Sequence, residues 1–186
     1  MDKNKWDNYL IKYTGEYGLK RDGVSINDIN GHLGITFSFL KLCNIDDEHK
    51  SFLDIGCETS NTNMVKAKWT GLDIIKREDE RIILGDAHEL PFNDNSFDII
   101  FSSHTLEHTL SPMICLIEMK RVIKNDGDLI IGVPCDPGFM SHGHNYVLTL
   151  AGWKHLIEQS GFIVVNAINS MNCGCLHCKI KQVKKK

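Results

Sequence analysis

The chain has 186 residues, of which 42% are hydrophobic and 24% charged, which is enough for one globular core and short for two. Its formal net charge of −3 gives no overall attraction for nucleic acid, and no apolar run reaches the roughly 20 residues of a membrane helix. The N-terminal segment lacks the apolar stretch of a signal peptide, and the seven cysteines are scattered rather than grouped as a disulfide framework. We therefore expect one cytoplasmic domain, with nucleic-acid and membrane partners disfavoured.

Two helices are expected before the first strand. Residues 4–15 place aromatic and aliphatic side chains at three- and four-residue spacing, and a second apolar pattern covers about 28–43. We expect residues 1–45 to form a helical cap or lid and residues 51–184 to form the core of the single domain.

Strands and helices alternate after that point. Residues 61–68 leave room for barely two helical turns, whereas 111–123 and 149–160 carry longer amphipathic patterns, the first with Leu116 and Ile117 inward and a turn at 125–127 after it. Apolar runs predict strands at 51–54, 69–73, 82–86, 96–103, 127–134, 162–168 and 175–183. The order predicts an α/β fold: a Rossmann-like, doubly wound, seven-stranded sheet, mostly parallel with an antiparallel last strand and helices on both faces.

The first strand and its turn are typical of a cofactor-binding element. The segment SFLDIGCETS (51–60) ends a buried strand near Asp54 and turns at Gly56. Such turns contact ligands at the carboxyl ends of the strands in doubly wound folds. Asp73 follows Asp54 by 19 positions, close to the roughly 20 that precede the ribose-binding acid of dinucleotide folds.

Five segments in fixed order resemble a known family: FLDIGC, TGLDI, GDAHELPFNDNSFDIIFSSHTLEH, MKRVIKNDGDLIIGVP and HLIEQSGF. Together they resemble the class I S-adenosylmethionine-dependent methyltransferases, especially the small family similar to the ubiquinone and menaquinone biosynthesis methyltransferases. The resemblance covers about residues 51–165. It implies S-adenosylmethionine as cofactor and in-line transfer of its methyl group to a small-molecule acceptor.

The same resemblance implies a set of site residues. Asp73, with Ile74, would hold the ribose, although a strand-end acid that caps a turn is the alternative. Asp86 and the Ala87 N–H would meet the adenine. The remaining candidates are Asp54, Gly56 and Cys57 at the methionine end, Ser102 and Ser103 at the mouth of the fourth strand, and His104 and His108 as catalytic candidates, with a packing role as the alternative for His108.

The glycine turn departs from the family pattern. Glu58 and Ser60 occupy positions where the family has glycine. A carboxylate at 58 would repel the carboxylate of the ligand by roughly 3 kcal/mol at about 5 Å and an effective dielectric near 20, unless it points to solvent. A non-catalytic binding or partner-regulating module of the same fold is therefore the alternative function.

Metal binding is not predicted. Cys173, Cys175, His177 and Cys178 are close in sequence, but alternate side chains on a strand face opposite ways, so structural cysteines are favoured over a metal site. His142 and His144, after the fifth strand, are candidates for a substrate loop, with a solvated loop as the equal alternative.

Overall fold

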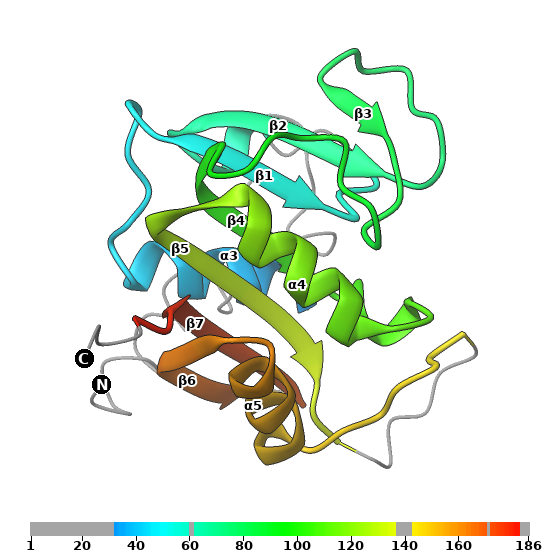
Figure 1. The fold of residues 1–186 in the computed structure, drawn as a ribbon, viewed down its shortest axis with the longest axis vertical. Helices are drawn as coiled ribbons and strands as arrows, with labels where there is room; N and C mark the ends of the chain where they lie inside the picture. The colour runs from blue at the N-terminus through cyan, green and yellow to red at the C-terminus, as the bar shows by residue number, and fades with distance from the viewer. Residues whose placement is uncertain (1–31, 60–61, 137–142, 171, 183–186) are drawn as a thin grey trace, which may run out of the picture.

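A seven-stranded sheet forms the centre of the computed structural model, which describes residues 32–59, 62–136, 143–170 and 172–182 (Figure 1). The strand order is β3-β2-β1-β4-β5-β7-β6. β7 runs antiparallel to both of its neighbours, and the pairs from β3 to β5 are parallel, which confirms the predicted sheet. The strands are β1 (Ser51–Ile55), β2 (Lys68–Asp73), β3 (Ile82–Leu84), β4 (Phe97–Ser103), β5 (Ile123–Pro134), β6 (Phe162–Ser170) and β7 (Cys173–Ile180).

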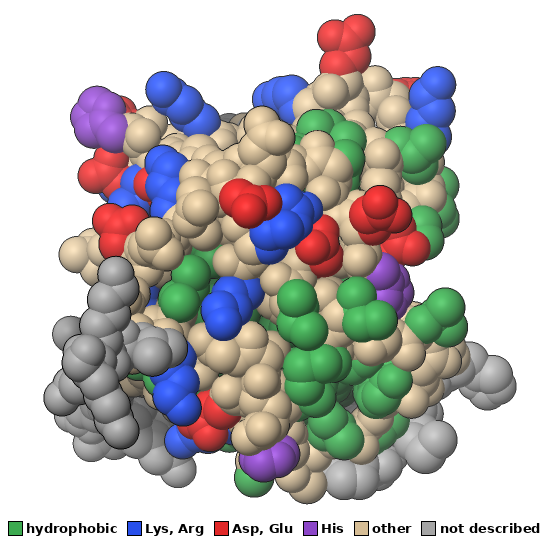
Figure 2. Space-filling model, viewed as in Figure 1, with side chains coloured by type: hydrophobic (Ala, Val, Ile, Leu, Met, Phe, Trp, Pro, Cys, Tyr) green, Lys and Arg blue, Asp and Glu red, His purple; other side chains and the backbone are tan. Residues whose placement is uncertain are grey.

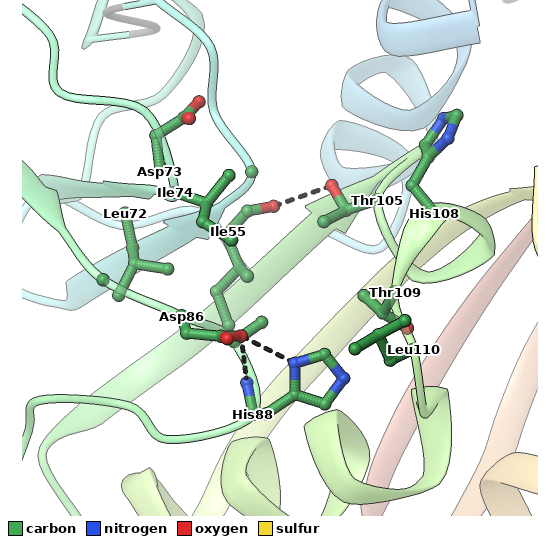
Figure 3. A pocket seen from close by; sticks show the side chains of 13 residues that line it. Ile55, Leu72, Asp73, Ile74, Asp86, His88, Thr105, His108, Thr109 and Leu110 are labelled. Atoms are coloured by element: carbon green, nitrogen blue, oxygen red, sulfur yellow. Dashed lines mark hydrogen bonds and ion pairs between the residues drawn. The ribbon is translucent and has the colours of Figure 1, made fainter. Parts of the chain in front are cut away.

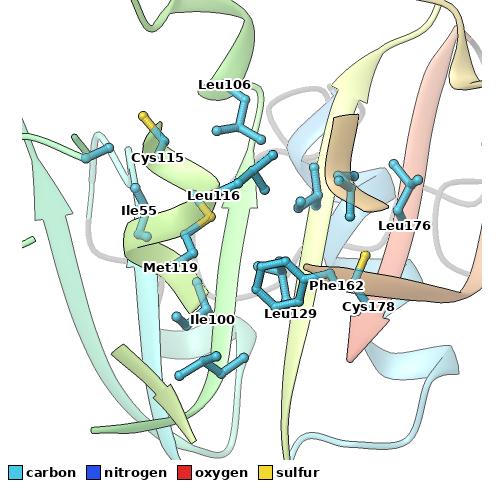
Figure 4. Close-up of a cluster of buried hydrophobic side chains, with 14 of the residues drawn as sticks. Ile55, Ile100, Leu106, Cys115, Leu116, Met119, Leu129, Phe162, Leu176 and Cys178 are labelled. Atoms are coloured by element: carbon cyan, nitrogen blue, oxygen red, sulfur yellow. The ribbon is translucent and has the colours of Figure 1, made fainter. Parts of the chain in front are cut away.

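Helices cover both faces of the sheet, as predicted. The α3 helix (His32–Leu42) packs on one face, where Phe37 stacks on Phe101 of β4. The helices α4 (Pro112–Val122) and α5 (Leu150–Gln159) pack on the other face. Figure 4 shows side chains of α4, among them Leu116 and Met119, close to buried strand residues on that face of the sheet, such as Ile55 and Ile100. Because side chains alternate along a strand, neighbouring residues of β1 and β4 enter opposite cores.

Local sequence signals explain where α4 and α5 begin. Ser111 is the N-cap of α4 and Pro112 is its first helical residue, where the missing N–H is not needed. The Thr149 side chain accepts a hydrogen bond from the Gly152 N–H and caps α5. Gly161 follows α5 with φ of +95°, the left-handed conformation that suits a glycine after a helix.

The structure corrects four details of the predicted elements. Between β1 and β2 the described residues form only the 3₁₀ turn η1 (Thr62–Met64) rather than a two-turn helix. β5 begins at Ile123, directly after α4, so 125–127 is part of an extended strand with a register shift against β4. β3 ends at Leu84 rather than residue 86, and β7 starts at Cys173, two residues early.

The predicted inward stripe of α4 was wrong at one position. Leu116 is fully buried, whereas Ile117 is 51% exposed. Figure 2 shows hydrophobic side chains on the surface over the region of α4. Successive helical residues are about 100° apart, so a residue directly after a buried one often faces outward.

The expected helix at 4–15 lies outside the described residues. Of the second expected helix, residues 32–43 are described, and 32–42 form α3. Within the described part of the chain, no helix is long and apolar enough to cross a membrane.

One carboxylate joins the beginnings of β1, β4 and β5. Asp98 accepts hydrogen bonds from the Ser51 N–H at 2.9 Å and the Ser51 hydroxyl at 2.7 Å, and Lys124 Nζ lies 2.8 Å from its Oδ1. Partial burial opposes the charged form, yet the bonds from Lys124 and Ser51 lower the pKa of Asp98 to about 2.

We expect acid to remove the contribution of Asp98 to stability. Its pKa in the folded state is below the ordinary value of about 3.9, so the contribution is complete above that value and is lost as pH falls toward about 2. The substitution Asp98→Asn should flatten this part of the pH profile of unfolding free energy, measured by urea denaturation. Asp94→Asn, which changes an exposed partner of Arg121, is the control and should leave the profile unchanged. A profile that Asp98→Asn leaves equally steep would contradict the assignment.

Candidate functional site

A pocket of about 220 Å³ lies at the carboxyl ends of β1, β2 and β4 and beside the segment that follows β3 (Figure 3). This is where doubly wound sheets bind ligands, because parallel strands end together at one edge. Six predicted site residues line it: Gly56, Asp73, Ile74, Asp86, Ala87 and His108. The other lining residues are Ile55, Leu72, Gly85, His88, Thr105, Thr109 and Leu110.

The turn after β1 depends on the glycine at 56. Gly56 has φ of +72°, and its N–H donates to the carbonyl of Leu72 at 2.8 Å. A Cβ at this position would lie 2.2 Å from the Thr105 hydroxyl oxygen. That hydroxyl donates to the Ile55 carbonyl at 3.0 Å and so ties the end of β4 to the end of β1. The close approach of these two segments forms one wall of the pocket.

Asp73 is buried and its carboxylate already organises the loop around it. Its Oδ2 accepts from the Glu58 N–H at 2.9 Å and lies 3.1 Å from Arg77 Nη2, while Oδ1 accepts from the Ile75 N–H at 2.8 Å. A carboxylate has about four lone-pair positions, of which three are used here. A ribose with two hydroxyl groups would therefore have one free position and would need to displace Arg77 for a second.

Asp86 forms a hydrogen-bonded chain with His88 and Ser111. Its Oδ1 accepts from the His88 N–H at 2.9 Å and lies 2.6 Å from His88 Nδ1, and these bonds lower the pKa of the Asp86 carboxyl. His88 Nε2 accepts from the Ser111 N–H at 3.0 Å. The accepting nitrogen carries no proton, so this geometry fits a neutral imidazole that donates from Nδ1. These hydrogen bonds hold Asp86 at the edge of the pocket, and Figure 3 shows those between Asp86 and His88.

Two residues predicted for the methionine end of the ligand lie outside the pocket lining. Asp54 is buried and accepts a hydrogen bond from the Trp69 indole at 3.2 Å. Cys57 is also buried, and burial, reinforced by Asp54 and Asp73, raises the pKa of its thiol to about 12. Asp54 follows Leu53 and precedes Ile55, both of which enter the core under α4, so strand alternation directs Asp54 to the α3 face.

The two serines at the end of β4 also lie outside the lining. Ser103 donates to the Thr36 hydroxyl of α3 at 2.9 Å. Ser102 is buried, and its hydroxyl has no hydrogen-bond partner among the described residues. Their roles in cofactor binding stay predictions.

The two histidines predicted as catalytic candidates occupy different environments. His104 is outside the pocket lining, with Nδ1 at 2.9 Å from Glu107 and Nε2 at 3.3 Å from the Cys173 thiol. Burial opposes its charged form, but the contacts with Cys173 and Glu107 raise the pKa of His104 to about 9. His108 lines the pocket, and its Nδ1 lies 2.9 Å from the carbonyl of Gly143. Of the two, His108 is therefore placed beside a ligand in the pocket.

Glu58 does not line the pocket. Its side chain is exposed and its backbone has φ of +56°, a conformation that favours glycine. The position thus retains the backbone geometry of a glycine although the residue is glutamate. Ser60 lies outside the described residues.

Sequence reasoning missed His88 and Thr105. His88 stands inside the quoted segment GDAHELPF, where a histidine two residues after a strand-end acid could have suggested a local hydrogen bond. Thr105 had no such signal, because its partner Ile55 is 50 positions away. The cysteines of β7 separate as predicted, with Cys173 and Cys175 on the α3 face and Cys178 on the other.

Comparison with known proteins agrees with the sequence resemblance. Residues 53–131 match the family model described as "Methyltransferase domain". The chain is 42% identical over 64 residues to a demethylmenaquinone methyltransferase of Renibacterium salmoninarum, a match that covers 34% of this chain and 27% of that protein. A protein of Escherichia coli K12 named YafE is 32% identical over 99 residues, which cover 45% of this chain and 47% of that protein. The chain spans less than half the length of these two curated relatives.

Solved structures share the fold over most of the chain. A Burkholderia thailandensis 1,6-didemethyltoxoflavin-N1-methyltransferase, solved with 1,6-didemethyltoxoflavin and S-adenosylhomocysteine bound, has a TM-score of 0.71 at 14% identity over 96% of this chain and 88% of that one. The chain therefore has the fold of S-adenosylmethionine-dependent methyltransferases, and its residues 53–131 match the methyltransferase-domain model.

Proposed function

We propose that this protein transfers the methyl group of S-adenosylmethionine to a small-molecule acceptor. The observation that carries the proposal is the pocket with two acidic side chains, Asp73 and Asp86, at the carboxyl ends of neighbouring strands. Two of the similar proteins bear names of methyltransferases that act on small molecules, demethylmenaquinone and 1,6-didemethyltoxoflavin. The small-molecule class of the acceptor is inferred from them.

The residues present fit an adenosine-like ligand. Asp73 offers a carboxylate to the ribose hydroxyls, and Asp86 offers one to the exocyclic amine of the adenine beside the Ala87 N–H. Leu72 and Ile74 add apolar side chains to the lining of the same pocket. The pocket of about 220 Å³ is smaller than the roughly 300–1,000 Å³ of sites that enclose drug-sized ligands. The ligand would therefore be enclosed only in part by the described residues.

The chemistry asks little of the protein beyond alignment. When bound, S-adenosylmethionine supplies an electrophilic methyl group on a sulfonium, which leaves as a neutral thioether. The protein must hold the acceptor and the methyl group in line and keep water away. Such alignment can supply much of the lowering of the activation barrier. His108, whose Nδ1 is held by the Gly143 carbonyl, lines this side of the pocket and is placed to contact an acceptor there.

Titration with S-adenosylhomocysteine tests the proposal. Calorimetry on the purified chain should show saturable binding of one equivalent. No detectable heat at millimolar ligand would overturn the enzyme assignment and favour a non-catalytic binding module of the same fold. Adenosine alone should bind more weakly, because it lacks the methionine end of the ligand.

A further inference from the structure

A carboxylate that the proposed reaction does not use is buried beside the pocket. Glu107 lies in the 3₁₀ turn η2 (Leu106–His108) after β4, and its side chain is 0% exposed. Its Oε1 lies 2.9 Å from His104 Nδ1 as an ion pair, and both carboxylate oxygens are buried with no hydrogen-bond partner among the described residues. An ionised carboxylate in such a place costs several kcal/mol unless a cation compensates it. His104 pairs with Oε1, so Oε2 is the carboxylate oxygen left open for a cation.

Two imidazoles converge on this carboxylate from different segments. His108 belongs to the same turn, and His144 belongs to the loop between β5 and α5. One donor atom from each of Glu107, His108 and His144 lies within 4.8 Å of the other two. His144 Nδ1 is itself buried with no hydrogen-bond partner among the described residues. Two of the three side chains therefore carry unused, buried donor atoms.

The imidazole of His108 is oriented as metal-binding histidines are. A carbonyl oxygen only accepts, so the 2.9 Å contact of His108 Nδ1 with the Gly143 carbonyl places the proton on Nδ1 and leaves the lone pair on Nε2. A ligating histidine nearly always donates its other ring N–H to such a group, which fixes the tautomer. The ion pair of His104 with Glu107 Oε1 occupies one oxygen of the carboxylate and leaves Oε2 for a cation.

Backbone hydrogen bonds hold the two segments together. The backbone N–H groups of Asn145 and Tyr146 both donate to the Glu107 carbonyl, at 2.7 and 3.1 Å. The side-chain amide of Asn145 donates to the His108 carbonyl at 2.9 Å. The position of His144 relative to Glu107 is thus set by its own neighbours in the chain. A site supported in this way needs little reorganisation to accept an ion.

We propose that Glu107, His108 and His144 bind a divalent transition-metal cation. Two imidazole nitrogens and one carboxylate oxygen suit Zn²⁺, Fe²⁺ and their neighbours rather than Mg²⁺ or Ca²⁺, which prefer oxygen ligands. Zinc–nitrogen bonds of about 2.0–2.1 Å place tetrahedral donors about 3.4 Å apart, so the three side chains close by about 1 Å when the ion binds. The sequence pattern predicted no metal site. A metal site was an alternative only for the cysteine-rich segment of β7, where structural cysteines were favoured.

Three protein ligands leave a coordination position for an exogenous oxygen or nitrogen ligand. Because His108 also lines the pocket, that position borders the space where an acceptor would bind. An acceptor with an ionisable hydroxyl group is the class that such an ion would hold, lowering the pKa of the hydroxyl so that its proton is released to water. This last step rests on the proposed methyl transfer, whereas the metal site itself does not.

Cobalt provides the test, because Co²⁺ reports its ligands by absorption. The full chain, stripped with a chelator and kept reduced with a non-thiol reductant, is titrated with Co²⁺ in the absence of other ligands. We expect one equivalent with visible d–d bands and no thiolate-to-cobalt charge-transfer band. A thiolate band, or no binding at millimolar Co²⁺, would overturn the site, the first by placing the ion at the buried cysteines.

Variants test whether Co²⁺ binds at the proposed ligands or at another histidine. His144→Ala and Glu107→Gln should each weaken Co²⁺ binding about tenfold or more, because loss of even a group that only orients a metal ligand costs about 10–100-fold in affinity. His155→Ala, on the exposed side of α5, is the matched control and should bind as the parent does. If Glu107→Gln fails to fold, His144→Ala still decides, because His144 lies in a loop outside the core clusters. Parent-like affinity in His144→Ala contradicts the proposal.

The failure of the metal site and the failure of methyl transfer give different results. His144 does not line the pocket, so His144→Ala should retain S-adenosylhomocysteine binding. A chain that binds Co²⁺ but no S-adenosylhomocysteine keeps the metal site and loses the methyltransferase assignment. The reverse outcome removes only the metal site.

Discussion

Replacement of Asp73 with alanine is expected to weaken S-adenosylhomocysteine binding about a hundredfold. Hydrogen bonds to a charged group contribute about 1.5–3 kcal/mol each, and the ribose offers two hydroxyl groups to this carboxylate. A loss of about 3 kcal/mol corresponds to roughly two orders of magnitude in Kd, which isothermal calorimetry would measure. Asp86→Ala should weaken binding less, because Asp86 is half exposed and already occupied by His88.

The structural role of Asp73 requires a separate control. Its carboxylate accepts from the Glu58 and Ile75 N–H groups and pairs with Arg77, so alanine also disturbs the loop. Arg77→Met removes the ion pair but keeps the carboxylate, and frees a lone-pair position on Oδ2. We expect this variant to bind S-adenosylhomocysteine as tightly as the parent or more tightly. If both variants lose affinity equally, Asp73 acts through its ion pair and not through the ribose.

The second large effect is expected at the turn after β1. Gly56→Ala should lower the free energy of unfolding by about 2–5 kcal/mol, measured by urea denaturation. The left-handed φ of +72° costs a residue with a Cβ about 1–2 kcal/mol, and overpacking costs about 1–3 kcal/mol more. The new Cβ would lie 2.2 Å from the Thr105 hydroxyl oxygen, so the wall of the pocket must shift. Binding of S-adenosylhomocysteine should fall with it.

Two further variants divide this effect into its causes. Thr105→Ala, added to Gly56→Ala, removes the two nearest colliding atoms and should recover part of the stability, while the strain at φ of +72° stays. Glu58→Gly introduces a glycine at a residue with φ of +56° and so removes backbone strain. It should stabilise the chain by about 0.5–1 kcal/mol. A destabilised Glu58→Gly would show that the exposed carboxylate makes contacts more important than its backbone strain.

Patterns within short segments predicted most of the fold. The apolar run of β4, the Ser111-Pro112 helix start and the Gly161 helix end are local signals, and each element lies where its signal stands. Predictions failed where a local signal competed with pairing to another strand. The residues 125–127 have the composition of a turn, yet β5 extends through them because its start pairs with Phe97 across a register shift.

The candidate site divides along the same line. Gly56, Asp73 and Asp86 could be placed in one pocket from the sequence, because residues at the ends of parallel strands must meet at one edge of the sheet. Asp54 and Ser103 were assigned to the same place, but each sits one position from a strand residue that faces the other core. A shift of one residue along a strand reverses the face, and sequence spacing alone does not fix which face holds the ligand.

The sequence by itself determined the class of fold, the family resemblance and the strand-end acids, all of which depend on periodicity and on short spacings along the chain. Only the tertiary structure decided which lone pairs are already in use at Asp73 and Asp86, that Glu58 stands clear of the pocket, and that Glu107 and His144 face each other. Several of these facts depend on contacts between segments 15 to 37 positions apart, as between Glu58 and Asp73 or Asn145 and His108. Chain folding sets these long-range contacts, whereas the bond between Asp86 and His88 is local.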